Sequence, residues 1–461
     1  MGINSETEKT ELFERAAVPK AVMTMAIPTI LSSLVMVLYN LADTYFVGML
    51  NDAIQNSAVT LAAPVLLAFN AVNNLFGVGS SSMMSRSLGK KDFDSVRRSS
   101  ALGFYCALAC GILFSIGYTA FRQPLLMALG TDAETVGTTG EYLKWTVTCG
   151  AAPAILNVVL AYLVRAEGAS LHASIGTMSG CLLNIILDPI FILPWGLGMG
   201  ASGAGLATFL SNCAACGYFF LLLYCRRGKT LVCIRPSMLK ADKVILAEIC
   251  GVGIPAAIQN LLNVTGMTVL NNFTSAYGPD TVAAMGIAQK VNMIPLYIAL
   301  GFSQGIMPLV SYNYAGKNGR RMKDIILFAA KLAVGFMVVI TAGYYLGADR
   351  LIGLFMKNET IVQYGSGFLR GLCMALPFLC LDFLAVGIFQ ACGLGKKALV
   401  FAVLRKVVLE IPALFLLNRL WPMYGLAYAQ LVAEVVLSAA AVITVAGLFK
   451  KTVSSDVDRP G

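Results

Sequence analysis

Long apolar runs separated by short polar breaks dominate the chain. The stretches 21–41, 101–120, 327–346 and 425–448 each approach or exceed the roughly 20 residues that a helix needs to cross a bilayer. They are continuous runs, unlike the one-sided stripe of a surface helix. The pattern predicts about twelve membrane-spanning helices, near 19–48, 57–87, 93–121, 133–166, 169–193, 201–225, 243–276, 281–314, 320–345, 358–392, 397–419 and 424–449.

The two halves of the sequence resemble each other at an offset of about 226 residues. Ala26–Pro28 is echoed by Gly253–Pro255, and Ala166–Gly168 corresponds to Ala391–Gly393. This repeat predicts an all-α membrane protein with twelve transmembrane helices in two six-helix lobes related by pseudo-two-fold symmetry. The expected organisation is an N-terminal segment at 1–18, an N-lobe at 19–225, a linker at 226–242, a C-lobe at 243–449 and a tail at 450–461.

Composition excludes an ordinary soluble protein. The chain is 57% hydrophobic and only 13% charged, whereas soluble domains carry about 25% charged residues. A net charge of +10 would suggest nucleic acid in a soluble protein, but here the basic residues lie between spans, so no nucleic-acid partner is expected. Most of the 12 cysteines lie in apolar runs, and the Cys213–Cys216 C-x-x-C has no second pair at zinc-site spacing.

Basic residues in alternate connections predict the orientation of the chain. They cluster at 86–98, 165, 226–243, 317–323 and 396–406, the last including Arg405 and Lys406. The opposite connections hold few: Arg122, Lys144, Arg350, Lys357 and Arg419. The positive-inside rule then places the basic connections and both termini in the cytoplasm.

Two aspartates interrupt the apolar runs of the first half. A carboxylate at the bilayer centre costs about 2.5–3.5 kcal/mol on insertion scales, so Asp43 and Asp188 are candidates for a cavity, a bound cation or a proton relay. Helical spacing places Tyr39 and Asn40 on nearly the same face as Asp43. The alternative is that both acids simply pair with polar neighbours in the lobe core.

The second aspartate has its own polar neighbours. Asn184 precedes Asp188 by one helical turn, and Thr208 adds a hydroxyl from the next span. Pro189 removes a backbone donor and frees a carbonyl one turn earlier. Carboxylate, amide, hydroxyl and carbonyl oxygens together suit sodium or a proton.

The second half does not copy these aspartates. At the equivalent offset Asp43 falls near Val269 and Asp188 falls near Pro412. The C-lobe instead has its own acids in apolar runs, and substrate binding and ion-pair scaffolding both remain open for them. The acids are Asp382, Glu410 and Glu434, and their candidate partners are Gln259, Lys290 and Arg370.

Several spans also contain prolines, which bend helices. They are Pro28, Pro64, Pro153, Pro255, Pro295, Pro308 and Pro377. Pro28 lies about four turns before Asp43 on the same predicted helix, so it is the candidate conformational hinge.

These residues resemble a known family, the multidrug and toxic compound extrusion (MATE) transporters. The resemblance rests on Leu38–Gly48, Arg165–Gly168 and Asn184–Pro189, together with the two six-helix lobes. It implies a secondary antiporter, not an enzyme, that exports cationic amphipathic drugs by alternating access in exchange for protons or sodium.

Within the family the sequence is most similar to the DinF-like branch. That likeness implies an N-lobe cation site, with Pro28, Tyr39, Asp43, Asn184, Asp188 and Thr208 matching its residues. The NorM-like branch has a glutamate on the seventh helix, where the nearest residue here is Gln259. Asp382 and Glu410 complete the candidate C-lobe substrate or ion residues.

The resemblance also implies the cofactors, partners and location. No cofactor is expected beyond the coupling ion, H⁺ or Na⁺, with Asp43, Asn184 and Asp188 as the residues that would bind sodium. The expected partners are small cationic drugs and the lipid bilayer, and the protein is expected to be a monomer in the cell membrane. Two alternatives are a flippase for a lipid-linked saccharide of the same superfamily and, from another class, a membrane enzyme or scaffold.

Overall fold

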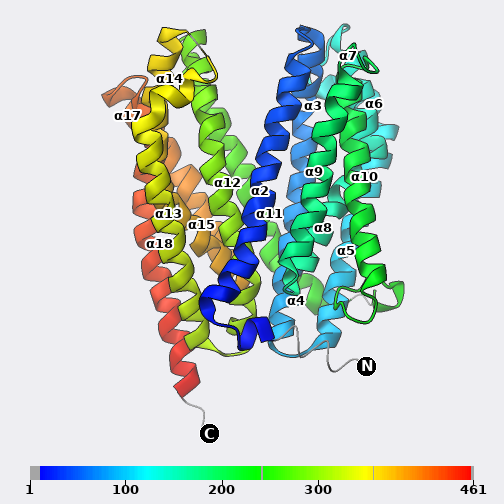
Figure 1. The fold of residues 1–461 in the computed structure, drawn as a ribbon, viewed down its shortest axis with the longest axis vertical. Coiled ribbons are helices and arrows are strands. Elements are labelled where there is room, and N and C mark those ends of the chain that lie inside the picture. Colours follow the sequence, from blue (N-terminus) through cyan, green and yellow to red (C-terminus); the bar gives the residue numbers. More distant parts are fainter. Residues whose placement is uncertain (1–10, 240–241, 357, 458–461) are drawn as a thin grey trace. The chain divides into compact units, whose positions relative to one another are not determined.

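The structure is a computed structural model that describes residues 11–239, 242–356 and 358–457, and all regular structure in these ranges is helical (Figure 1). Lys357, two residues of the linker, and the outer parts of the predicted N-terminal segment and tail lie outside the described residues. The first half contains α2 (Val18–Gly48), α3 (Ala53–Val72), η1 (Asn73–Val78), α4 (Gly79–Gly89), α5 (Phe93–Ala120), α6 (Arg122–Ala128), α7 (Thr135–Leu143), η2 (Lys144–Cys149), α8 (Ala151–Ala166), α9 (Ser170–Ile192) and α10 (Ala201–Cys225).

The second half follows a short 3₁₀ turn, η3 (Pro236–Met238). The η1, η2 and η4 segments are π-helical turns within longer helices. The helices of this half are α11 (Lys243–Ser275), α12 (Pro279–Ala315), α13 (Gly319–Gly353), α14 (Glu359–Met374), α15 (Leu376–Ala391), α16 (Gly395–Val403), η4 (Leu404–Glu410), α17 (Ile411–Leu420) and α18 (Gly425–Val457).

The described residues contain nine helices that are long and apolar enough to cross a membrane, and two bent pairs raise the number to eleven. These correspond to eleven of the twelve predicted spans. The twelfth, 397–419, is also helical, but it is divided among α16, η4 and α17 and carries Arg405, Lys406 and Glu410 in its middle. The chain is an all-helical membrane protein, as predicted.

Both bent pairs have a proline directly after the bend. The α7–η2 segment meets α8 at 50°, with Gly150 between them and Pro153 in the first turn of α8. The α14 and α15 helices meet at 44°, with Pro377 as the second residue of α15. Proline removes a helical hydrogen bond and clashes with the preceding turn. The prediction that prolines bend the spans is confirmed at these two positions.

Contacts divide the chain into two compact units. Unit 1 contains Leu31–Ala257 and the chain before Ala16, and unit 2 contains Ala16–Ile30 and the chain from Ile258 onward. One division falls between Arg15 and Ala16, and the other two fall inside α2 and inside α11, so each of these helices contributes one part to each unit. The sequence instead placed the lobe boundaries in the connections.

The two units share local structure at the offset seen in the sequence. The Ser85 hydroxyl donates to the carbonyl of Ala166 at 3.0 Å, and the Ser311 hydroxyl donates to the carbonyl of Ala391 at 2.7 Å. Both bonds are buried and join helices that are distant in sequence. The repeat therefore includes specific interhelical hydrogen bonds in addition to the apolar pattern.

A matching turn follows α4 and α12. Lys91 and Lys317 have positive φ angles of 60° and 56°, and the next residue's N–H bonds back five residues at 3.0 and 2.9 Å, as in a Schellman cap. Asp92 and Asn318 then cap α5 and α13 by accepting from backbone N–H groups at 3.1 and 3.2 Å. Hydrogen bonds from Ser95 lower the pKa of Asp92.

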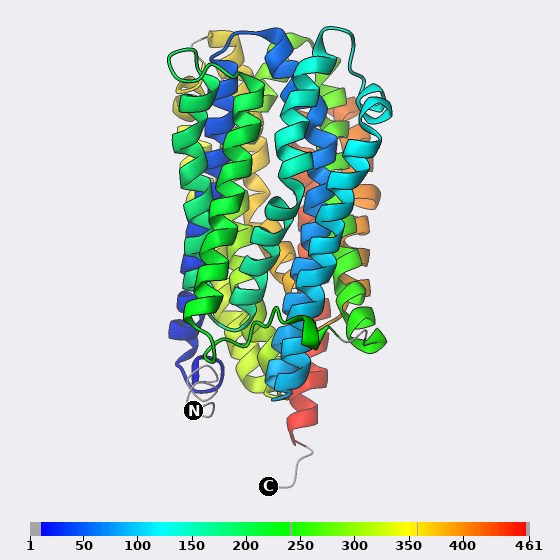
Figure 2. The ribbon, with the colours of Figure 1, turned by 90° about the vertical axis from the view of Figure 1, so that its right-hand side faces the viewer.

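Glu167 fixes the linker to unit 1. Its side chain is buried and accepts from the Thr230 hydroxyl at 3.0 and 3.1 Å and from the backbone N–H of Leu231 at 2.7 Å. Further along the linker, the Tyr105 hydroxyl donates to the carbonyl of Ile234 at 2.8 Å. Figure 2 shows this connection crossing the lower end of unit 1. The equivalent position of the second half is Cys392, which has no carboxylate.

We expect Glu167→Ala to destabilise the protein by about 3 kcal/mol, because it removes the hydrogen bonds to one buried carboxylate and leaves the donors unpaired. Thermal unfolding should begin at a lower temperature, and trypsin should cleave the basic linker faster. Glu134→Ala is the matched control, because that side chain is exposed at the start of α7. An unchanged cleavage rate in Glu167→Ala would show that the carboxylate does not hold the linker.

Candidate functional site

The site in unit 1 begins with one face of α2. Tyr39 and Asp43 are half-buried one helical turn apart on this helix. Asn40, which the sequence placed on nearly the same face, is exposed and donates to the carbonyl of Met36 at 2.8 Å. The helix α2 therefore contributes the hydroxyl of Tyr39 and the carboxylate of Asp43 to the site.

The second contribution comes from α9, which packs along α10 (Figure 2). Asp188 is fully buried and Asn184 is 2% exposed. With its amide nitrogen facing Asp188, Asn184 donates to Asp188 Oδ2 at 2.8 Å and accepts from the backbone N–H of Thr208 at 3.1 Å. This orientation satisfies both ends of the amide. The i, i+4 spacing predicted from the sequence thus forms a hydrogen bond.

Thr208 on α10 connects the two contributions. Its hydroxyl is hydrogen-bonded with the Tyr39 hydroxyl, and Asp43 and Asp188 are close enough to interact electrostatically. Three helices, α2, α9 and α10, therefore bring together the five residues that the sequence analysis selected for the N-lobe. We call this group the Asp43–Asp188 site.

The structure adds Tyr142, which the sequence analysis missed. Tyr142 is 4% exposed on α7, two residues before the start of the π-helical turn η2, and it interacts electrostatically with Asp43, Asp188 and Tyr39. Gly205 lets this segment approach α10, since a Cβ there would lie 3.0 Å from the carbonyl oxygen of Tyr142. Only the adjacent π turn, a feature frequent at functional sites, marks Tyr142, and π turns cannot be read from the sequence.

The chemistry of the Asp43–Asp188 site suits a small hard cation or a proton. Its polar groups are carboxylate, amide and hydroxyl oxygens and one amide nitrogen, and no cluster of three or more His, Cys, Asp or Glu able to hold a metal occurs in the described part of the chain. Two neighbouring carboxylates away from water repel each other. Binding a proton or a cation removes that repulsion.

Pro28 lies apart from this site. It belongs to the Ala16–Ile30 part of α2, which is in unit 2, whereas Asp43 is in unit 1. As a proline it cannot bond to the carbonyl of Thr24 one turn earlier. The same segment packs closely on α12, where a Cβ on Gly305 would lie 2.7 Å from the Cα of Ala26.

The candidate acids of unit 2 are held in ion pairs. Asp382, 1% exposed, accepts from Arg405 at 3.2 Å, and Arg405 also lies 3.2 Å from Glu434. Lys406 donates to both oxygens of Glu410 at 2.7 and 2.6 Å. We call these five residues the unit 2 charge cluster.

This cluster corrects the sequence analysis in one respect. The sequence pattern predicts that Arg405 and Lys406 belong to a basic connection, but they are 4% and 7% exposed in the π-helical turn η4. The sequence does not show that Arg405 is paired, because its acids Asp382 and Glu434 lie in other helices, whereas the partner of Lys406, Glu410, follows it by one helical turn. The other basic connections are unaffected by this correction.

The remaining candidate partners of unit 2 lie elsewhere. Gln259 accepts from Gln390 at 3.1 Å and not from the cluster, although Arg405 reaches Asn263 on the same helix at 3.1 Å. Arg370 pairs with Asp349 at 2.6 Å, and Lys290 is exposed.

Three carboxylate oxygens of the cluster lack hydrogen-bond donors among the described residues: both oxygens of Glu434 and Oδ1 of Asp382. The guanidinium of Arg405 lies 4.8 Å from the ring centroid of Phe383, which covers the charge with an aromatic face. Three acids and two bases are buried together. The cluster is thus close to neutral, with one acid in excess.

Comparison with known proteins identifies the family and the fold. The MatE family profile matches residues 28–190 and 255–416, one segment in each half. The chain is 34% identical to the multidrug export protein MepA of Staphylococcus aureus (strain MRSA252), over 95% of this chain and 96% of that protein. It is 33% identical to MepA of Staphylococcus saprophyticus, with the same coverage.

Solved structures show the same fold. An outward-facing multidrug resistance MATE family transporter of the MOP superfamily superimposes with a TM-score of 0.91 at 25% identity, covering 97% of this chain and 99% of that one. A MOP superfamily transporter from Pyrococcus furiosus, described as having a binding pocket of reverse polarity, gives a TM-score of 0.88 at 25% identity, with 96% and 98% coverage. Since the family profile covers most of both halves and the relatives align over nearly their whole length, the chain belongs to the MatE family of transporters.

Proposed function

We propose that the protein exports small drugs from the cell by exchanging them for protons or sodium, with the Asp43–Asp188 site as the coupling site. The observation that carries this proposal is the convergence of two carboxylates with Tyr39, Asn184 and Thr208 inside one unit. The names of the MepA relatives, multidrug export proteins, support a drug as substrate. The resemblance of the sequence to the multidrug and toxic compound extrusion transporters supports cationic, amphipathic drugs.

Coupling follows from the electrostatics of two adjacent acids. A cation or proton that binds between Asp43 and Asp188 removes their repulsion and lets α2 and α9 pack more closely. Loss of the cation restores the repulsion. Because Asp43 lies on α2, the change occurs on a helix that also contributes Ala16–Ile30, with Pro28, to unit 2. Pro28 remains the candidate hinge.

The unit 2 charge cluster is proposed to be mainly an ion-pair scaffold. Arg405 is shared by Asp382 and Glu434, and Lys406 by Glu410, so these acids already have cations. The same pairing argues against the flippase alternative, since Arg405 and Lys406 offer little uncompensated positive charge to a lipid-linked pyrophosphate. We further propose a monomer in the cell membrane, with both termini in the cytoplasm.

Asp43→Asn and Asp188→Asn should each reduce drug export to background, a loss of at least about tenfold, because an amide neither binds a proton nor carries the charge that attracts a cation. Efflux of a fluorescent cation from cells, normalised to the amount of protein in the membrane, measures the effect. Asp324→Asn makes the same chemical change at an exposed position and should export normally. Normal export by both site variants would refute the coupling role.

Drug flux in proteoliposomes should require an imposed ion gradient. We expect rapid flux when a proton or a sodium gradient is applied separately in the direction opposite to the drug, and only slow leakage without either. The two gradients, tested one at a time, identify the coupling ion. Flux that ATP drives in the absence of both gradients would contradict an antiporter.

Arg405→Leu should destabilise unit 2 strongly, by about 3–5 kcal/mol, because it leaves Asp382 and Glu434 buried without their shared cation. Asp382→Asn should cost less and preserve export, since Arg405 retains Glu434. Thermal unfolding of the purified variants and cellular efflux provide the two measurements. If Asp382→Asn abolished export at unchanged stability, the cluster would be a coupling site and not a scaffold.

A further inference from the structure

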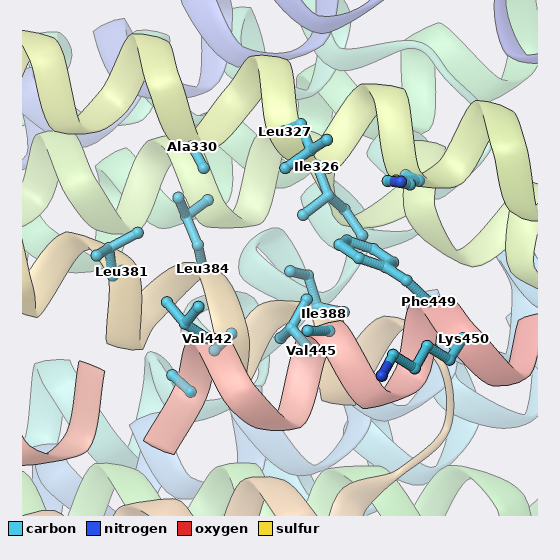
Figure 3. Close-up of a pocket in the computed structure, with 14 residues that line it drawn as sticks. Ile326, Leu327, Ala330, Leu381, Leu384, Ile388, Val442, Val445, Phe449 and Lys450 are labelled. Carbon is cyan, nitrogen blue, oxygen red and sulfur yellow. The ribbon is translucent and has the colours of Figure 1, made fainter. Parts of the chain in front are cut away.

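An apolar groove of about 720 Å³ lies between α13, α15 and α18 in unit 2 (Figure 3). Its volume is within the range of about 300–1,000 Å³ typical of ligand sites. None of its lining residues belongs to the unit 2 charge cluster or to the Asp43–Asp188 site. The proposals made above leave this groove without a role.

The groove is long and narrow. On α18 its lining runs from Ala441 to Lys450, nine residue steps or about 13–14 Å along the helix. The hollow exists because each of the three helices contributes a small side chain to it: Ala330 from α13, Ala385 from α15 and Ala446 from α18. A long, thin apolar space of this kind fits an extended hydrocarbon chain.

Two lysines lie at one end of the groove, and every other lining residue is apolar. In Figure 3, Ile326 lies near Phe449, whereas Ala330 lies toward Val442, so α13 and α18 run in opposite directions. Lys323, one turn before Ile326, is therefore at the same end as Lys450. Both lysines are exposed, and neither has an ion pair or hydrogen bond among the described residues.

The membrane setting determines what can fill this space. The groove is formed by α13, α18 and the second part of the bent α14–α15 pair, all of which are membrane spans. In a bilayer such a groove is accessible to acyl chains, and the two lysines at its end would meet a negatively charged head group. The positive-inside rule assigns that end to the cytoplasmic leaflet.

We propose that this groove binds an anionic phospholipid, with one acyl chain lying along Ala330, Ala385 and Ala446 and the phosphate bound by Lys323 and Lys450. The lysines make the site selective for anionic over zwitterionic lipid. The apolar lining of the groove should keep the lipid bound when the protein is purified in detergent. Both properties are independent of drug transport.

Native mass spectrometry of the full-length purified protein tests the selectivity, using phosphatidylglycerol and phosphatidylcholine with identical acyl chains. We expect phosphatidylglycerol to bind more tightly, and Lys323→Gln and Lys450→Gln each to weaken its binding about fivefold, or about 25-fold together. Lys397→Gln, an exposed lysine outside the groove, is the matched control and should leave binding unchanged. Equal binding of both lipids to all variants would overturn the proposal.

A second pair of variants tests the groove itself. Ala330→Phe and Ala446→Phe fill the space and should remove the bound phosphatidylglycerol, while normal drug efflux shows that the protein still folds. If the lysine variants weaken binding but the filled variants do not, the lipid is held by surface charge alone and the groove is not its site. Displacement of the lipid by a transported drug at equal concentration would likewise overturn the proposal.

Discussion

The cost of burying charge in a membrane protein shapes both units. A charged group that leaves water needs a partner, and the units meet this need differently. Unit 2 supplies opposite charges, with Arg405 shared by Asp382 and Glu434. Unit 1 surrounds Asp43 and Asp188 with an amide and hydroxyls and supplies no basic side chain. The two acids of the Asp43–Asp188 site therefore have no cationic side chain among the residues described around them, whereas each acid of the unit 2 charge cluster is ion-paired.

The two units differ in their buried charges but share local backbone structure. The hydrogen bonds from Ser85 and Ser311, and the left-handed turns at Lys91 and Lys317, recur at almost the same offset. These interhelical hydrogen bonds and turns are thus common to both units, while the buried acidic and basic side chains differ between them. A shared scaffold with unlike chemistry fits a transporter whose two units have separate tasks.

The sequence was sufficient for the spans and for the pair Asp43 and Asp188, because an apolar run and an acid within it are both local signals. It was insufficient for Tyr142, whose role depends on a π turn and on close approach to Gly205. It also misplaced Arg405, whose neutralising acids Asp382 and Glu434 come from other helices, and Lys406, although its partner Glu410 is only four residues away. Local patterns predict which residues are costly to bury, but the compensation for that cost is tertiary.

The division of α2 and α11 between the units has a mechanical consequence. Glu167 holds the linker against unit 1. The chain passes from one unit to the other inside α2, after Ile30, and inside α11, after Ala257. Pro28 and Pro255 each precede one of these points by two residues. At these two junctions the described chain is continuous helix and not a flexible loop. Each proline removes one backbone hydrogen bond within a turn of the residue where its helix passes from one unit to the other, so these are the points at which the two helices are most easily bent.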